Sequence, residues 1–154
     1  LINGYLEKLK ERVSDSIYLS AYAQPKTNLK NGSEYKIKPE DETVWTITDV
    51  TLYGDHYLLS FIIENEKGIQ LNLPVADENK WFYSSEKVDE YKQLYGGFYK
   101  NILKKTVKIG MPKEALEIAW GKPDKINRSS YGSDQWVYNG QYVYIENGKV
   151  KSWN

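Results

Sequence analysis

The sequence has no cysteine, a single histidine and no long hydrophobic run, and each shortage excludes a class of function. Without cysteine there can be no disulfide framework, thiol nucleophile or zinc-thiolate site. The longest apolar stretches, such as Phe61-Ile62-Ile63, are far shorter than the roughly 18 residues that a membrane-spanning helix needs. The sequence therefore predicts no transmembrane segment.

Net charge is also missing, because 21 basic residues balance 21 acidic ones. Proteins that bind nucleic acid or anionic membranes usually carry a basic excess, so we expect no nucleic-acid partner and no polybasic membrane patch. The length of 154 residues fits one domain or two small ones. A chain of this length can bury about 70% of its unfolded surface, which is enough for a core without disulfides.

Residues suited to catalysis or metal binding are few and poorly placed. His56 follows Gly54-Asp55 in an expected turn, which favours an ordinary exposed residue over a general base or ligand. The run Glu40-Asp41-Glu42 lacks the alternating ligands and central glycine of a calcium loop, so we interpret it as a solvated turn. No serine lies in a nucleophile elbow. We predict no catalytic residue, no metal and no cofactor.

Residues 1–83 predict a helix followed by a small curled antiparallel β module. The helix is expected over residues 2–13, where Tyr5, Leu6, Leu9 and Val13 share one face. Period-two alternation predicts strands over 17–23, 43–52, 57–63, 69–75 and 81–83, separated by turns at Gly54-Asp55 and Asn65 to Gly68. Several short strands joined by tight turns resemble an SH3-like module in pattern alone.

The second predicted strand, residues 43–52, changes face along its length. Its apolar positions are Trp45 and Ile47 in the first half, but Val50 and Leu52 in the second. Since side chains in a strand alternate between faces, this change of parity predicts a bulge or bend near Asp49.

Residues 84–154 predict a helical connector and then a helix with a sheet. Ser84-Ser85-Glu86 is a plausible helix cap, and Gly96-Gly97 divides the connector into two helical pieces. We expect the second piece to pack on the C-terminal sheet. A further helix is expected to begin near Met111, with Pro112 in its first turn, and to stop at Gly121 and Pro123.

Two Asn-Gly pairs, Asn139-Gly140 and Asn147-Gly148, predict type I′ hairpins that join strands 134–138, 141–146 and 149–153. A two-residue turn fixes register, so we expect Val137 opposite Tyr142 and, in the second hairpin, Tyr144 opposite Lys151 and Tyr142 opposite Trp153. One face would then carry the apolar residues Trp136, Tyr138, Val143, Ile145 and Val150. The other would carry Val137, Tyr142, Tyr144, Lys151 and Trp153.

The spacing of Gly110-Met111, Gly121-Lys122-Pro123, Trp136-Val137-Tyr138 and Asn147-Gly148-Lys149-Val150 resembles the SmpA/OmlA (BamE-like) family of small bacterial envelope domains. The resemblance covers about the last third of the chain. It implies an α+β fold of helices on a three-stranded antiparallel meander, in a non-enzymatic protein that binds other envelope proteins. It also implies a periplasmic or cell-surface location and a lipid anchor, which would lie upstream of Leu1.

These patterns favour a non-catalytic protein-binding or scaffolding protein, with the face of Val137, Tyr142, Tyr144, Lys151 and Trp153 as its contact surface. Alternatively, that face is covered by the preceding module or by residues 1–23. Two other functions stay open: a small hydrolase that acts on a cell-wall or sugar substrate through carboxylates, and an inhibitor of a secreted enzyme. If Trp136 and Trp153 lay on one common side of the sheet, the family assignment and this predicted contact surface would fall together.

Overall fold

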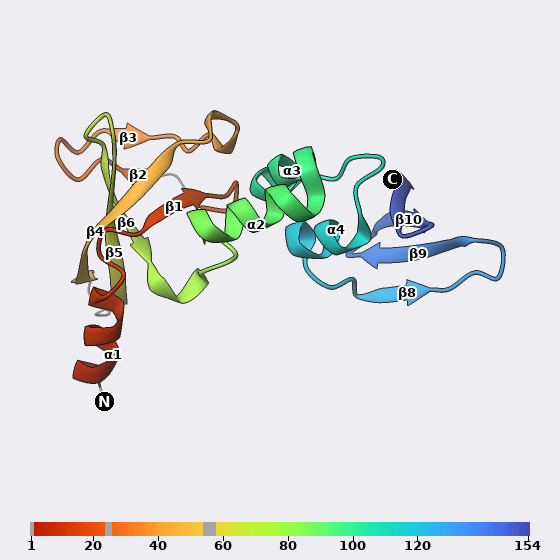
Figure 1. The fold of residues 1–154 in the computed structure, drawn as a ribbon, viewed down its shortest axis with the longest axis horizontal. Coiled ribbons are helices and arrows are strands. Elements are labelled where there is room, and N and C mark those ends of the chain that lie inside the picture. The colour runs from red at the N-terminus through yellow and green to blue at the C-terminus, as the bar shows by residue number, and fades with distance from the viewer. Residues whose placement is uncertain (1, 24–25, 54–57) are drawn as a thin grey trace. The chain divides into compact units, whose positions relative to one another are not determined.

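The computed structural model describes residues 2–23, 26–53 and 58–154, which form two compact units, Leu1–Asp89 and Glu90–Asn154 (Figure 1). The chain combines helices with antiparallel sheets, which confirms the α+β class. The division falls inside helix α2 (Ser85–Tyr95), a little beyond the predicted limit at residues 83 and 84.

The first unit is built on a five-stranded antiparallel sheet in the order β6-β5-β4-β1-β7. Its strands are β1 (Ser16–Leu19), β4 (Val44–Tyr53), β5 (Leu58–Asn65), β6 (Gln70–Pro74) and β7 (Phe82–Ser84). Between β1 and β4 the chain forms a small hairpin of β2 (Lys26–Thr27) and β3 (Glu34–Tyr35), then the short 3₁₀ helix η1 (Pro39–Asp41). A second 3₁₀ helix, η2 (Val75–Asp77), precedes β7. The last strand thus returns beside the first.

The core of this unit contains the inward side chains of the sheet, including Trp45, Ile47, Phe61 and Ile63. The predicted bulge is confirmed, because Ile47 pairs with Ile63 whereas Asp49 pairs with Ile62, which leaves Thr48 as the extra residue. Beyond the bulge Val50 is buried as expected. Leu52 is 55% exposed, so its predicted inward position is wrong.

The N-terminal elements are shorter than the sequence predicts. Helix α1 spans Ile2–Lys10, and it buries Leu9 while Tyr5 and Val13 are exposed. Strand β1 ends at Leu19, and the hydroxyl of the next residue, Ser20, donates a hydrogen bond to the carbonyl of Lys80 (2.6 Å) and accepts one from the Tyr22 amide (3.2 Å). The predicted Gly54-Asp55 turn, His56 and Tyr57 lie outside the described residues.

The helical segment that comes after β7 in the chain is interrupted at Gly96-Gly97, as predicted. The Ser84 hydroxyl caps α2 by accepting a hydrogen bond from the Lys87 amide (3.1 Å). The 3₁₀ helix η3 (Gly96–Phe98) separates α2 from α3 (Tyr99–Lys104), and α4 spans Lys113–Trp120. Helix α3 packs against α4 (Figure 1), and the indole nitrogen of Trp120 donates to the carbonyl of Lys105 at 2.9 Å.

Helix α4 begins later than predicted. Pro112 is its extended N-cap residue, and the first helical residue is Lys113. The delay has a clear cause: the Gly110 amide donates to the Val150 carbonyl and the Val150 amide donates to the Met111 carbonyl, so this segment is paired with the last strand. Gly121, with φ of 85°, ends the helix as expected.

The second unit contains a four-stranded antiparallel sheet in the order β11-β10-β9-β8. Strands β9 (Ser133–Tyr138), β10 (Gln141–Glu146) and β11 (Lys149–Trp153) confirm the predicted meander. The sequence prediction missed β8 (Lys125–Asn127), which is only three residues long and pairs with β9.

Candidate functional site

The side of the C-terminal sheet that faces away from α4 is the first candidate site. Val137 lies opposite Tyr142 and Gln135 lies opposite Tyr144, as predicted. Strand β8 extends the same side, because Lys125 lies opposite Val137 and Asn127 opposite Gln135. We call this side the outer face; it comprises Lys125, Asn127, Gln135, Val137, Tyr142, Tyr144, Glu146, Lys149, Lys151 and Ser152.

The predicted register of the second hairpin is wrong beyond its first two pairs. Tyr144 pairs with Ser152, and Val143 pairs with Trp153, which leaves Lys151 as a bulged extra residue. Backbone hydrogen bonds between Tyr142 and Asn154, at 2.8 and 2.9 Å, hold the shifted register. Paired residues share a side of the sheet, so Trp153 lies in one row with Val143 and Trp136. Trp153 therefore shares the side of Trp136, which overturns the contact surface as the sequence predicted it and counts against the family resemblance. The outer face does not include Trp153.

The other predicted residues do come together on the outer face. Tyr142 is 38% exposed, Lys151 is exposed, and Val137 and Tyr144 are half-buried. Asn127 donates from its side-chain amide to Gln135 Oε1 (2.7 Å), and Gln135 Nε2 donates to the Tyr144 hydroxyl (3.1 Å). These hydrogen bonds run across three strands and hold the Tyr144 ring in place. These contacts order the surface without any ligand.

The opposite side of the sheet is occupied by α4 and has a structural role. The rings of Trp120 and Tyr138 meet edge to face with centroids 5.3 Å apart, and the Tyr138 hydroxyl donates to the carbonyl of Gly121 at 2.9 Å. Burial raises the pKa of Tyr138, and the charges of Glu117 and Asp124 raise this pKa further. These aromatic residues attach the helix to the sheet.

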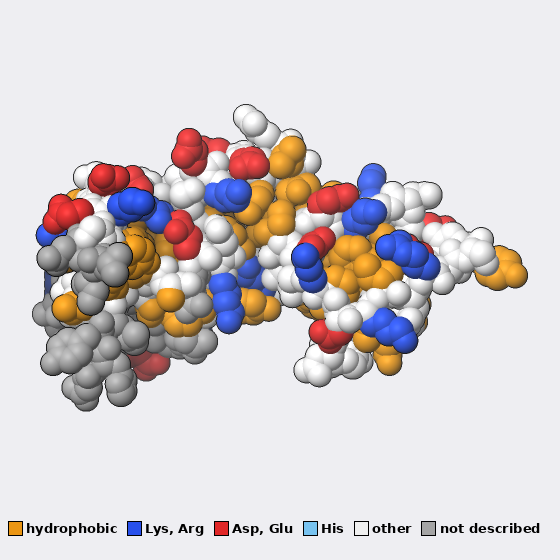
Figure 2. Space-filling view, turned by 90° about the horizontal axis from the view of Figure 1, so that it is seen from below, with side chains coloured by type: hydrophobic (Ala, Val, Ile, Leu, Met, Phe, Trp, Pro, Cys, Tyr) orange, Lys and Arg blue, Asp and Glu red, His pale blue; other side chains and the backbone are white. Residues whose placement is uncertain are grey.

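Charge is divided unequally between the two units, although it sums to zero over the chain. Residues 1–89 hold 10 Lys and Arg against 15 Asp and Glu, whereas residues 90–154 hold 11 against 6. On the face shown in Figure 2, both basic and acidic side chains lie around an apolar patch of the second unit. Counting charge over the predicted modules would have revealed this asymmetry, which the sum over the whole chain conceals.

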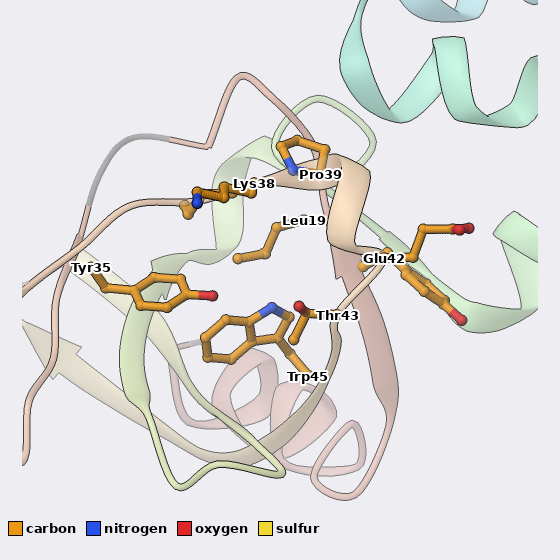
Figure 3. A pocket seen from close by; sticks show the side chains of 9 residues that line it. Leu19, Tyr35, Lys38, Pro39, Glu42, Thr43 and Trp45 are labelled. Carbon is orange, nitrogen blue, oxygen red and sulfur yellow. The ribbon is translucent and has the colours of Figure 1, made fainter.

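The described part of the first unit includes a very small concavity and a much larger one. One lies beside the edge-to-face pair of Tyr35 and Trp45, whose ring centroids are 5.5 Å apart (Figure 3), but it offers only about 10 Å³. That space suits about one water molecule. The other is an open groove of about 930 Å³ along the outward side of β4.

Among the described residues no group of three or more His, Asp or Glu side chains is placed to hold a metal ion. Residues 40–42 form the end of η1, where Glu40 and Asp41 are exposed and Glu42 adopts a left-handed conformation (φ 49°). This geometry agrees with the predicted solvated turn.

Across the described residues, the helices are too short or too polar to cross a membrane. Comparison of the chain with models of protein families, with curated proteins and with solved structures finds no match.

Proposed function

We propose that this chain is a non-catalytic binding protein of the bacterial cell envelope that contacts a protein or peptide through the outer face. The observation that carries the proposal is the exposed Tyr142 beside the half-buried Tyr144 and Val137. Tyrosine contributes large contact area with little loss of side-chain entropy, and it is enriched among the residues that dominate binding energy. A polar rim completes the surface.

The rim favours a partner with negative charge. Lys125, Lys149 and Lys151 are exposed on the outer face, and Glu146 is its one acidic residue. Lys151 forms an ion pair with Glu146 at 3.1 Å. Because opposite charges steer association and disfavour wrong partners, an acidic protein segment suits this face best.

The envelope location and the lipid anchor upstream of Leu1 stay predictions from the family resemblance. The two helices, the Gly121 stop and the β9-β10 hairpin agree with that resemblance. The placement of Trp153 on the side of Trp136, and the additional strand β8, depart from it. The binding proposal therefore depends on Tyr142 and Tyr144 more than on the family.

An SH3-like architecture for the first unit is also a proposal. In favour of it, three consecutive strands form a meander, a long excursion separates β1 from β4, and a 3₁₀ helix precedes the last strand, which pairs with the first. Because a fold does not determine function, this architecture alone does not decide between a binding role and a catalytic one.

The carboxylate-dependent hydrolase is less well supported. A general acid needs a carboxyl group whose pKa is raised in apolar surroundings, beside a second carboxylate. The carboxylates that line the open groove of the first unit are Asp41, Glu42, Glu64 and Glu66, and none of them is buried. No observation favours the inhibitor over other binding proteins.

Site-specific crosslinking in living cells tests the proposal. A photoreactive phenylalanine analogue is introduced at Tyr142 or at Tyr144 in the organism that makes the protein, and crosslinked products are identified by mass spectrometry. We expect the same protein partner from both positions. The matched control is Tyr5, which is 52% exposed on α1 and should not give this product.

Purified variants then measure the contribution of the face. Tyr142→Ala should weaken binding to the identified partner by about tenfold or more, as for a central aromatic contact, whereas Tyr5→Ala should leave it unchanged. Crosslinks from position 142 to residues of the same chain alone would show that the face is covered internally. That result, or products shared with position 5, would contradict the proposal.

A further inference from the structure

The groove of the first unit runs along the outward side of β4. Its floor is formed by Val44, Thr46 and Thr48, which alternate with the buried Trp45 and Ile47. Val44 is 44% exposed although it is apolar. From Val44 to Thr48 a strand spans about 13 Å, which is the length of four to five residues of an extended peptide.

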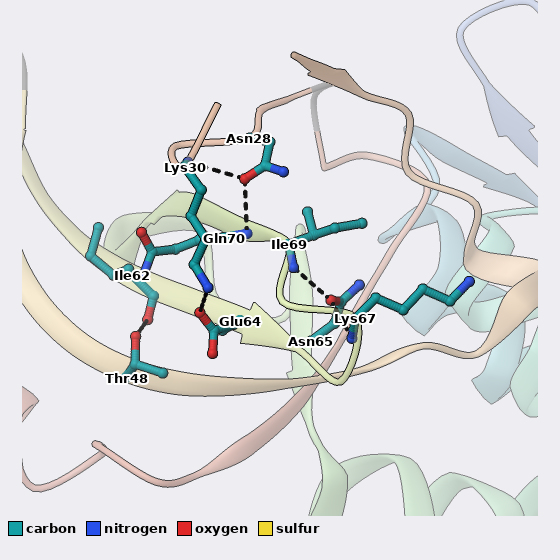
Figure 4. A network of polar contacts seen from close by, with 9 residues as sticks. All are labelled: Asn28, Lys30, Thr48, Ile62, Glu64, Asn65, Lys67, Ile69 and Gln70. Carbon is teal, nitrogen blue, oxygen red and sulfur yellow. Dashed lines mark hydrogen bonds and ion pairs between the residues drawn. The ribbon is translucent and has the colours of Figure 1, made fainter. Parts of the chain in front are cut away.

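One wall of the groove is the turn between β5 and β6, and hydrogen bonds hold it rigidly. The side-chain oxygen of Asn65, which is 7% exposed, accepts hydrogen bonds from the Lys67 and Ile69 amides at 3.1 and 3.0 Å (Figure 4). The Gly68 amide donates to the Asn65 carbonyl at 3.0 Å. This wall is therefore formed in the absence of any ligand.

The other wall is the segment from Tyr35 to Thr43. Here the Glu42 amide donates to the Pro39 carbonyl at 3.0 Å and closes the 3₁₀ turn. Tyr35 lines the groove while its ring packs against Trp45. Since Trp45 is 2% exposed and belongs to the core, this wall is anchored to the centre of the unit.

The walls carry mainly negative charge. Four carboxylates line the groove, from Asp41, Glu42, Glu64 and Glu66, and the one lysine among the lining residues is Lys67. Lys30 compensates Glu64 through an ion pair of 2.8 Å. A negative excess remains, and the first unit as a whole shares it. An occupant with positive side chains would be complementary.

We propose that this groove binds an extended, lysine- or arginine-bearing peptide segment. Alternate side chains of the peptide would lie over Val44, Thr46 and Thr48, and the cationic ends of the others would reach the carboxylates of the two walls. This site is independent of the outer face of the second unit and selects a partner of the opposite charge. The chain would then join an acidic partner to a basic one.

Nuclear magnetic resonance on the full chain tests the groove. The ¹⁵N-labelled protein is titrated with a capped Lys-Val-Lys-Val-Lys peptide, and with a capped Glu-Val-Glu-Val-Glu peptide as the ligand control. We expect the largest amide shifts at Val44, Thr46, Thr48 and residues 64–69, with the basic peptide only. Shifts of equal size with the acidic peptide, or no localised shifts at millimolar peptide, would overturn the proposal.

A charge-reversal pair provides the matched variants. Asp41→Lys with Glu66→Lys changes two exposed groove residues, and Glu7→Lys with Glu11→Lys makes the same change of net charge on and just beyond α1. The groove variant should bind the basic peptide about tenfold more weakly, while the control keeps most of the affinity. A well-dispersed amide spectrum of each variant serves as the control that the variant is folded. If both variants bound the basic peptide equally weakly, net charge alone would explain the effect, and the proposal of a defined site would be refuted.

A dilution series of the unliganded protein, followed by the same amide spectra, decides whether a second copy of this chain is the occupant instead. If the groove amides shift when the unliganded protein is diluted, self-association fills the groove, and the peptide proposal fails. Because these variants leave the second unit unchanged, their outcome is separate from that of the Tyr142 crosslinking experiment.

Discussion

The two sheets of this protein are assembled in different ways. In the second unit each strand pairs with its neighbour in sequence, and two-residue Asn-Gly turns join β9 to β10 and β10 to β11. In the first unit β1 pairs with β4 and with β7, so its register depends on residues far away in the chain. Local turns can specify one sheet by themselves, whereas the other depends on its buried core.

The two units also differ in what they expose. The outer face of the second sheet presents tyrosine and lysine, while the groove of the first sheet presents threonine and carboxylates. A neutral chain thus carries two surfaces of opposite character. Composition over the full length conceals functional information that appears only when the units are considered separately.

Removing a core aromatic side chain from the first sheet should have the largest effect. Phe61 is fully buried, meets Phe82 edge to face with centroids 6.1 Å apart, and has the Arg12 guanidinium 5.4 Å from its ring centre. Phe61→Ala should lower the free energy of unfolding by about 3–5 kcal/mol. Urea denaturation followed by circular dichroism measures this loss.

Amide hydrogen exchange on the same variant tests whether the units are distinct. We expect protection to fall in β4, β5 and β7 while the amides of β9 and β10 keep theirs. Equal loss in both sheets would mean that the chain unfolds as one cooperative body. Leu52→Ala is the control, since Leu52 is 55% exposed and its truncation should cost less than about 0.5 kcal/mol.

A buried lysine should make the stability of the second unit depend on pH. Lys105 is 8% exposed, and burial lowers its pKa from 10.5 to about 8. Below pH 8 the lysine is charged in both states, so the full cost of burying that charge destabilises the fold. As pH rises from 8 towards 10.5 the folded state releases a proton that the unfolded state still holds, and this contribution to stability increases.

Lys105→Met should therefore be more stable than the unmodified protein at pH 7, by on the order of 1 kcal/mol after allowance for solvent screening. The advantage should shrink as pH approaches 10. Urea titrations at several pH values measure the difference between the two proteins. The neighbouring Lys104 is exposed, so Lys104→Met should show no such trend; a parallel trend in both variants would assign the effect to another group.

The sequence predicted most of the second sheet because its determining residues are neighbours. The pairs Val137 with Tyr142 and Ile145 with Val150 follow from the Asn-Gly turns alone. The error with Trp153 arose because hairpin register was extended past a bulge at Lys151, which the backbone pairing of Tyr142 with Asn154 imposes. The alternation of polar and apolar residues could not reveal this bulge, because the residues on both sides of Trp153 in the sequence are polar.

In the first unit the change of parity between Ile47 and Val50 correctly predicted a bulge. The position of β1 between β4 and β7 could not be predicted, because no local pattern identifies a distant partner strand. The groove was missed for the same reason. Its two walls come from segments more than twenty residues apart, and only the fold places them on either side of β4.

Another small effect tests whether local turns specify the second sheet. Asn147 and Gly148 have φ of 53° and 76°, as a type I′ turn requires. A side chain at Gly148 would meet nothing within 4 Å, so Gly148→Ala should cost only the strain of the left-handed backbone, about 1 kcal/mol. Thermal unfolding with Gly97→Ala as control measures this cost, since Gly97 lacks a positive φ and also has open space. Equal stability of the two variants would mean that packing against residues 110–112, rather than the turn, determines the register of β11.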